Sequence, residues 1–131
     1  MIAANELRIG NWVYETIVDL DNGGCKSNPT QIDGNRIKCI EAGDIVRGIP
    51  LSNELLLDCK FVFNEHSNSY RFFSHKEEWI LAAQQTMDKS CFKIGLPTDK
   101  RCDQYMTSLV YLHEIQNITF ALTGQELTIK L

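Results

Sequence analysis

His113 is followed by Glu114, and this pair forms the first two letters of the zinc-protease motif H-E-x-x-H. That motif binds zinc because histidines four residues apart lie on one helix face, while the glutamate activates the bound water. Here the fourth residue after His113 is Asn117, whose neutral carboxamide is a poor zinc ligand. The chain also lacks a GxxxxGK[ST] or GxGxxG segment. We therefore expect no metal and no cofactor.

Cysteine-dependent hydrolysis is the enzymatic alternative, and it requires a thiol activated by a histidine. Cys102 precedes the helix of His113 and is the best-placed thiol for it. No flanking glycine signature accompanies Cys102, and the five cysteines form an odd set without a CxxC pair. We expect most of the thiols to be reduced and several to be small core residues. The sequence therefore favours a protein that is not an enzyme, with a cysteine-dependent hydrolase as an alternative.

The segment from about residue 108 to Gly124 has the periodicity of an amphipathic helix. Its predicted buried stripe follows i, i+4, i+7 and i+11: Tyr111, Ile115, Ile118 and Leu122. The opposite side carries three neutral polar groups around one aromatic ring: His113, Gln116, Asn117 and Phe120. This side is either solvated or a contact surface for a protein partner or a second copy of the chain.

A second candidate surface lies near the N-terminus, where Trp12 and Tyr14 share one face of a predicted strand. Outward aromatic residues of a small barrel can contact peptides or nucleic acids, but in a small domain we favour their burial. The formal net charge is -4, and among the basic residues only Lys100 and Arg101 are adjacent. A basic stripe for phosphate contacts is therefore missing, and a nucleic-acid-associated accessory protein is only an alternative.

The composition bounds the class of protein. The chain has 131 residues, of which 44% are hydrophobic and 23% charged, as in an ordinary globular domain. No apolar run approaches the roughly 20 residues that a membrane-spanning helix needs. The first residues lack a basic segment followed by an apolar one. We expect one domain over residues 1–131 in the cytoplasm, without a membrane segment.

The N-terminal part is predicted to be mostly β. A two-residue alternation predicts a strand over residues 7–15, with a bulge or close backbone approach at Gly10. Turn residues at 21–24 predict a loop that continues through Pro29, and Asp33-Gly34-Asn35 predicts a hairpin turn. We expect residues 1–48 to form a small barrel or curved sheet that could stand as a β-rich subdomain.

The rest of the chain predicts a helix, a hairpin, and an ambiguous segment. Ser52 can cap a short helix that buries Leu55, Leu56 and Leu57. Residues 60–63 and 70–73 predict a hairpin, whereas residues 74–96 fit either a capped helix or two strands with a turn at 88–90. Residues 126–131 alternate as a closing strand. The expected fold class is α+β, with a central β-meander and one main C-terminal helix packed on the sheet.

Both ends of the chain resemble one family of short proteins from bacterial prophage and mobile-element regions. The resemblance rests on NELRIGNWV at residues 5–13, on IPL at residues 49–51 followed by two leucines, and on YLHEIQNITFALTGQELTI at residues 111–129. It differs from the family pattern at Ser52, Glu114 and Thr119, where relatives carry threonine, glutamine and tyrosine. The resemblance implies a bacterial or phage setting and a β-meander over residues 60–96, and it implies no catalytic residues.

These observations favour one function class over two others. The leading hypothesis is a non-enzymatic protein-interaction or structural accessory module of prophage or mobile-element origin. Its partner would be another protein or a second copy of the chain, bound through the helix side that carries His113, Gln116, Asn117 and Phe120. A nucleic-acid-associated protein and a cysteine-dependent hydrolase are the alternatives.

Overall fold

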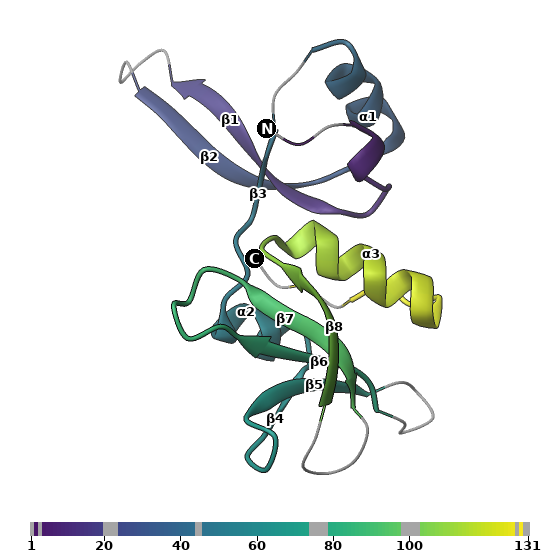
Figure 1. The fold of residues 1–131 in the computed structure, drawn as a ribbon. Coiled ribbons are helices and arrows are strands. Elements are labelled where there is room, and N and C mark those ends of the chain that lie inside the picture. The colour runs from purple at the N-terminus through teal and green to yellow at the C-terminus, as the bar shows by residue number, and fades with distance from the viewer. Residues whose placement is uncertain are drawn as a thin grey trace. The chain divides into compact units, whose positions relative to one another are not determined.

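A computed structural model describes residues 2, 4–19, 24–43, 46–73, 79–97, 103–127 and 129. Over these residues the chain is α+β, with eight strands in two open antiparallel sheets and one main C-terminal helix (Figure 1). This confirms the predicted fold class, with open sheets instead of a small barrel. The chain divides into two compact units, Met1–Pro50 with Tyr111–His113, and Leu51–Val110 with Glu114–Leu131.

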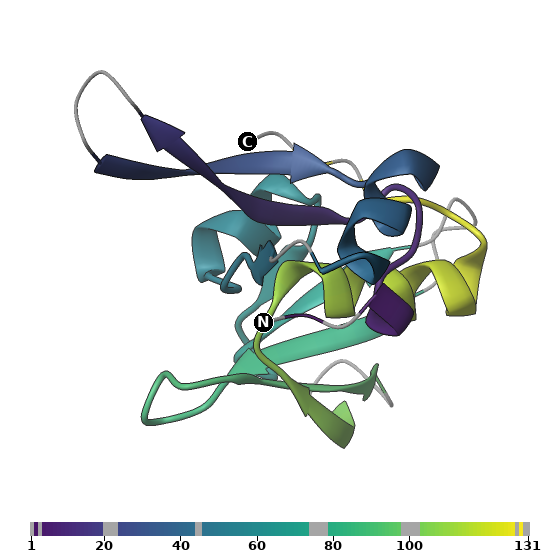
Figure 2. The same ribbon diagram turned by 90° about the horizontal axis from the view of Figure 1, so that it is seen from above.

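The first unit is built on a three-stranded sheet with the order β2-β1-β3. In Figure 2, β1 and β2 form a long twisted hairpin with α1 near one of its ends. The elements are η1 (Ala4–Glu6), β1 (Trp12–Asp19), β2 (Gly24–Gln31), α1 (Gly34–Glu41) and β3 (Val46–Gly48). One hydrophobic cluster forms its core: Ile2, Val13, Ile32, Ile40 and Val46.

The predicted first strand begins too early. Ile9 and Gly10 form a turn, Gly10 has a φ of 98°, and β1 starts only at Trp12. A residue with positive φ interrupts a strand, and glycine adopts this conformation without the strain of a Cβ. The backbone N–H of Gly10 donates to Ile32 O at 2.8 Å, so the expected close backbone approach is present. The turn shifts the strand by five positions from the predicted start at Leu7.

Pro29 was predicted to lie in a loop, but it belongs to β2, where it pairs with Tyr14. β2 is an edge strand, and a proline without an N–H is tolerated there because one side of the strand needs no partner. The predicted turn at residues 21–24 falls mostly outside the described residues, and only Gly24, the first residue of β2, is described.

The predicted hairpin turn at Asp33-Gly34-Asn35 is wrong, because these residues begin helix α1. The side chain of Asp33 accepts a hydrogen bond from the backbone N–H of Arg36 at 2.8 Å, which makes Asp33 the N-cap. Ile37 and Ile40 then lie three residues apart on one helix face and pack onto the core of the first unit. An Asp-Gly pair can form either a turn or a helix N-cap. The spacing of the apolar residues that follow favours the helix.

The second unit is a five-stranded meander with the strand order β4-β5-β6-β7-β8. Its helices are α2 (Asn53–Asp58) and α3 (Leu112–Thr123), whose residues from Glu114 onward belong to this unit. Its strands are β4 (Val62–Asn64), β5 (Ser69–Phe73), β6 (Trp79–Gln85), β7 (Phe92–Pro97) and β8 (Asp103–Leu109).

Several predictions in this unit are confirmed. Ser52 caps α2 by accepting from the backbone N–H of Leu55 at 3.1 Å, and the hairpin of β4 and β5 is present. Leu55 and Leu56 are buried, but Leu57 is exposed, because a helix of six residues turns one of three consecutive leucines away from the core. The ambiguous segment contains strands β6 and β7 at residues 79–85 and 92–97, and residues 74–78 lie outside the described residues.

Helix α3 begins at Leu112 and ends before Gly124, whose φ of 71° confirms the predicted left-handed residue. The predicted stripe is wrong at Tyr111 and Leu122, which are exposed, and right at Ile115. The buried stripe follows i, i+3, i+4 and i+7: Leu112, Ile115, Gln116 and Thr119. Two of these residues are polar. A prediction from hydrophobicity alone therefore placed the buried stripe about one position away from the observed one.

The second unit differs from the prediction at two further places. Strand β8 was not predicted, and of the predicted closing strand, Glu126, Leu127 and Ile129 have no strand structure.

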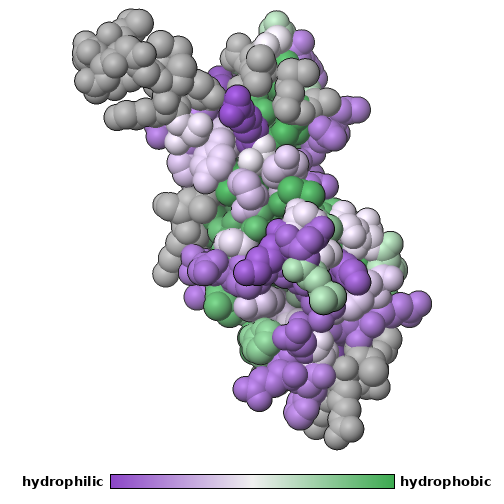
Figure 3. All heavy atoms as spheres, turned by 60° about the vertical axis from the view of Figure 1, so that its left-hand side comes forward, coloured by the Kyte–Doolittle hydropathy of each residue, from purple (hydrophilic) through white to green (hydrophobic). Residues whose placement is uncertain are grey.

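In the described part of the chain, helices long and apolar enough to cross a membrane are absent. On the surface drawn in Figure 3, hydrophilic residues predominate, and hydrophobic ones are exposed in scattered places.

Candidate functional site

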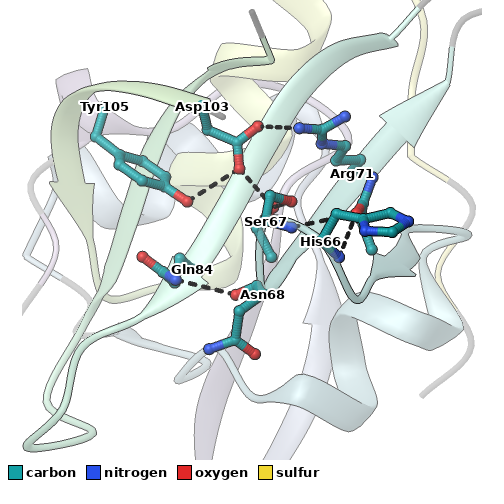
Figure 4. A network of polar contacts seen from close by, with 9 residues as sticks. His66, Ser67, Asn68, Arg71, Gln84, Asp103 and Tyr105 are labelled. Atoms are coloured by element: carbon teal, nitrogen blue, oxygen red, sulfur yellow. Dashed lines mark hydrogen bonds and ion pairs between the residues drawn. The ribbon is translucent and has the colours of Figure 1, made fainter. Parts of the chain in front are cut away.

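A buried ion pair spans one face of the five-stranded sheet, from β5 to the edge strand β8. Arg71 on β5 donates from Nη2 to Asp103 Oδ1 on β8 at 2.8 Å, and both side chains are only 1% exposed. The hydroxyl of Ser69 and the phenol of Tyr105 both donate to Asp103 Oδ2 (Figure 4). Ser67 exchanges a hydrogen bond of 2.7 Å with Ser69 and extends the network into the turn between β4 and β5. Asp103 thus has three donors.

The sheet register explains how β5 and β8 can meet across two intervening strands. Arg71 pairs with Ala82, Ala82 with Gly95, and Gly95 with Tyr105, so these four residues form one row on one face. Three strand spacings amount to about 14 Å, which exceeds the reach of arginine and aspartate in a flat sheet. The face must therefore be concave, and the small residues Ala82 and Gly95 leave room for the ion pair.

The groups of this network bind one another and connect strand β5 to strand β8. Burial raises the pKa of Tyr105 to about 12, and the negative charge of Asp103 adds to the effect. A phenol with this pKa stays protonated at neutral pH and acts as a hydrogen-bond donor. A carboxylate that accepts from an arginine, a serine and a tyrosine has little capacity left for a substrate. The network therefore stabilises the curved sheet.

The more accessible part of the second unit is β4, at one edge of the sheet. Val62 is 47% exposed and Phe63 is 43% exposed, and the ring of Phe63 lies 5.1 Å from that of Tyr70 on β5. The turn after β4 is held by Asn64, whose side-chain oxygen accepts from the backbone N–H groups of His66 and Ser67. Figure 4 shows His66 and Ser67 in this turn. On its inner side β4 pairs with β5.

Two pockets lie beside β4, and Phe63 lines both of them. The first has a volume of about 330 Å³ and is lined mainly by carboxamides, hydroxyls and aromatic rings: Asn53, Phe63, Asn68, Tyr70, Gln84, Gln85, Thr86, Met87 and Lys89. The second has a volume of about 340 Å³, is open, and runs along residues 62–66 of the edge itself. Concave sites with a few convergent polar groups are the usual places for ligands.

The structure separates the four residues of the predicted helix face. His113 and Gln116 are buried, at 4% and 1% exposure, while Asn117 is half-buried and Phe120 is exposed. The ring of His113 stacks on that of Tyr111 at 5.9 Å. Of the four side chains, Phe120 therefore presents the largest accessible surface. A binding role for this face stays a prediction.

The other predicted candidates are not brought together into a site. Trp12 and Tyr14 are both half-buried on β1. Cys102 lies outside the described residues, so the pair of Cys102 with His113 stays a prediction. Cys59 is buried, and burial together with the charge of Asp58 raises its pKa to about 12, which makes it a poor nucleophile. In the described ranges, groups of three or more potential metal ligands are absent.

The buried ion pair and the amide-lined pocket were both missed from the sequence. One signal was present for the ion pair, because Arg71 interrupts the aromatic run YRFF, and a charge within an apolar strand needs a partner. The pocket has no comparable signal, since its residues come from α2, β4, β5, the end of β6 and two turns. Comparison with known proteins adds nothing, because the chain matches no family profile, no curated protein and no solved structure.

Proposed function

We propose that this protein is a non-enzymatic interaction module that binds an extended segment of a partner protein as an added strand along the outer edge of β4. The observation that carries the proposal is the combination of an edge strand with a pocket beside it. β4 pairs only with β5 among the described strands, and Phe63 belongs both to this edge and to the pocket of about 330 Å³.

The backbone of β4 supplies the hydrogen bonds that such binding needs. In an antiparallel ladder, successive residues direct their N–H and C=O groups alternately towards the neighbouring strand and away from it. A strand of three residues, Val62–Asn64, therefore has at least one residue whose backbone groups point outward. Peptides that extend a sheet use such groups for affinity, while adjacent pockets select their alternate side chains.

The opposite edge, β8, is less suited to strand addition although it is longer. Its pairing with β7 shifts register at Gly95, which places Met106 in a bulge between Tyr105 and Thr107. A bulge disrupts the regular spacing of backbone groups and increases the local twist, which protects an edge from indiscriminate pairing. β4 is protected by its short length instead, and the neighbouring pockets can add the selectivity that three residues lack.

A binding role also fits the chemistry of the second unit. One polar cluster in it is the Arg71–Asp103 network, in which the buried Asp103 side chain is occupied by Arg71, Ser69 and Tyr105. The resemblance to prophage and mobile-element proteins supports a bacterial or phage partner, and the composition supports a cytoplasmic setting. The bacterial or phage partner and the cytoplasmic setting are parts of this proposal.

A phage-displayed library of random peptides tests this function, because it offers the edge strand extended segments with every kind of side chain. We expect the protein to enrich peptides that bind with a measurable Kd. The variants Phe63→Asp and Val62→Lys should lower their affinity at least tenfold, because both place a charge on the edge. The matched control is Met106→Asp on β8, which is also an exposed edge residue and should leave the affinity unchanged.

Three outcomes would contradict the proposal. One is that no peptide is enriched, and another is that Met106→Asp lowers the affinity as much as Phe63→Asp does. The third is self-association of the wild type in sedimentation experiments that Phe63→Asp abolishes, since the edge would then pair with a second copy of the chain. Because Phe63 and Val62 are both well exposed, circular dichroism should show that the variants remain folded.

A further inference from the structure

We infer that the amide-lined pocket beside β4 binds a small neutral sugar, whose ring packs on the aromatic wall of the pocket and whose hydroxyl groups form hydrogen bonds with the amides. The inference goes beyond the proposed function, because it assigns a ligand to the sheet face next to the edge strand. It follows from four lining residues that lie on one side of the sheet: Phe63, Tyr70, Gln85 and Asn53.

The register of the sheet places these residues side by side. Phe63 pairs with Tyr70, and their rings lie 5.1 Å apart. Tyr70 pairs with Ala83, and Gln85 is the next residue of β6 on the same face. Tyr70 and Gln85 are therefore diagonal neighbours, a separation that long and aromatic side chains can bridge. Asn53 on α2 donates from Nδ2 to Oε1 of Gln85 at 3.4 Å, so the rings and the amides form one continuous wall.

The polar groups of this wall are available to a ligand. Within the described part of the chain, the hydroxyl of Tyr70 and Nε2 of Gln85 take part in no hydrogen bond. Oδ1 of Asn53 is buried and likewise lacks a partner there. A buried acceptor without a partner is unfavourable, so a rotation of the Asn53 amide towards a ligand hydroxyl would be favoured. The wall thus offers donors and acceptors together, a pattern that several hydroxyl groups can complete.

The charge of the pocket favours a neutral ligand. Among the described residues that line it, Lys89 alone is charged, and it is exposed, where a charge contributes little in water. A nucleotide would lack the basic groups that its phosphates need, and an organic cation would lack a carboxylate.

The shape of the aromatic wall distinguishes a sugar from other neutral ligands. The rings of Phe63 and Tyr70 are tilted by 54°, so they cannot enclose a planar nucleobase between parallel faces. A pyranose presents C–H groups on its flat sides, which suit the electron-rich face of one ring, and hydroxyls around its rim. A purely apolar ligand would leave Tyr70 and Gln85 without the hydrogen bonds that water gives them. The volume of about 330 Å³ is at the small end of the range for ligand sites.

Saturation-transfer NMR with neutral mono- and disaccharides, anionic sugars and nucleosides tests the inference. We expect at least one neutral sugar to bind with a Kd that titration can measure. Tyr70→Phe and Gln85→Met each remove a hydrogen-bonding group at nearly constant size, and each should raise the Kd about threefold to tenfold. The matched controls are Tyr14→Phe on β1 of the first unit and Gln104→Met on β8, which should leave the Kd unchanged.

Three outcomes would overturn the inference. One is that no neutral sugar binds at millimolar concentration, and another is that a nucleoside or an anionic sugar binds more tightly than every neutral one. The third is that Tyr70→Phe and Gln85→Met bind the sugar as the wild type does, since the ligand then lies elsewhere. Circular dichroism should show both variants folded, because both side chains are only half-buried. Each of these outcomes leaves the proposed function standing, because an added strand binds backbone groups of β4.

Discussion

The two faces of the five-stranded sheet are both buried near their centres but by different means. One face carries Phe72, Leu81, Ala83, Phe92 and Ile94, which form an ordinary apolar surface. The other face carries the ion pair of Arg71 with Asp103 above Ala82 and Gly95. Apolar burial tolerates substitutions that conserve volume, whereas a buried ion pair is strongly destabilised when one partner is lost. The two faces should therefore tolerate different kinds of substitution.

The largest effect is expected for Asp103→Ala, which leaves the guanidinium of Arg71 buried without its carboxylate. Removing one partner of a buried ion pair costs about 3–5 kcal/mol of the free energy of unfolding. Urea denaturation followed by circular dichroism measures this loss. The double variant Arg71→Met with Asp103→Leu removes both charges and should recover part of the loss, because the hydroxyls of Ser69 and Tyr105 still lose their acceptor. A loss below about 1 kcal/mol for Asp103→Ala, the range of exposed ion pairs, would show that water reaches the pair.

The apolar face should respond to Leu81→Ala, which removes a fully buried side chain from β6. The expected loss is about 2–5 kcal/mol, from the lost transfer free energy and the remaining cavity. The control is Leu57→Ala on α2, where the side chain is half exposed and the change should stay within about 0.5 kcal/mol. An equal loss at both leucines, measured by urea denaturation, would contradict the assignment of Leu81 to the core.

A smaller effect is expected for Gly95→Ala, which tests the concave surface between Arg71 and Tyr105. An added Cβ would overlap the backbone carbonyl of Gln104 and lie 2.6 Å from Tyr105 Cα, so β7 and β8 would have to separate. We expect a loss of about 1–3 kcal/mol, as for other overpacked sites, visible as a lower Tm. Gly34→Ala is the control, because the nearest atom to its Cβ is 4.0 Å away. An unchanged Tm for Gly95→Ala would mean that the face is not tightly closed.

The smallest effect concerns pH and the phenol of Tyr105. Its pKa is raised from 10.0 to about 12, chiefly by burial, so the folded state favours the protonated phenol. The resulting stabilisation is complete below pH 10 and is lost as the pH rises to 12. The stability difference between the wild type and Tyr105→Phe should therefore shrink between pH 10 and 12. Cys59 also titrates in this range but is present in both proteins. A constant difference would show that Tyr105 ionises freely in the fold.

The sequence predicted best those elements whose signals are local. The Ser52 cap, the hairpin of β4 and β5, and the left-handed Gly124 each depend on a few adjacent residues. The capped helix beginning at Asp33 was missed because Asp-Gly fits a turn equally well, and only packing of Ile37 and Ile40 decides. Strand β8 was missed because its exposed and half-buried residues lack an apolar alternation.

The candidate site was harder to predict than the fold. Arg71 and Asp103 are 32 positions apart and meet only because the sheet bends over Ala82 and Gly95. The helix face was predicted from hydrophobicity, which cannot anticipate that Gln116 is buried while Leu122 is exposed. A buried polar residue and an exposed one look identical in a sequence. Whether a polar side chain is buried can be predicted only when its hydrogen-bond partners are known.

The position of the ion pair also has a consequence for the order of folding. Its two partners belong to the first and last of four consecutive paired strands, β5 to β8, so the contact closes only after the three hairpins between them have formed. We expect this contact to form after the folding transition state, with a φ-value near zero. Asp103→Ala should therefore leave the refolding rate nearly unchanged and accelerate unfolding instead. The ion pair would then slow the unfolding of the folded sheet and would have little effect on the rate at which the sheet forms.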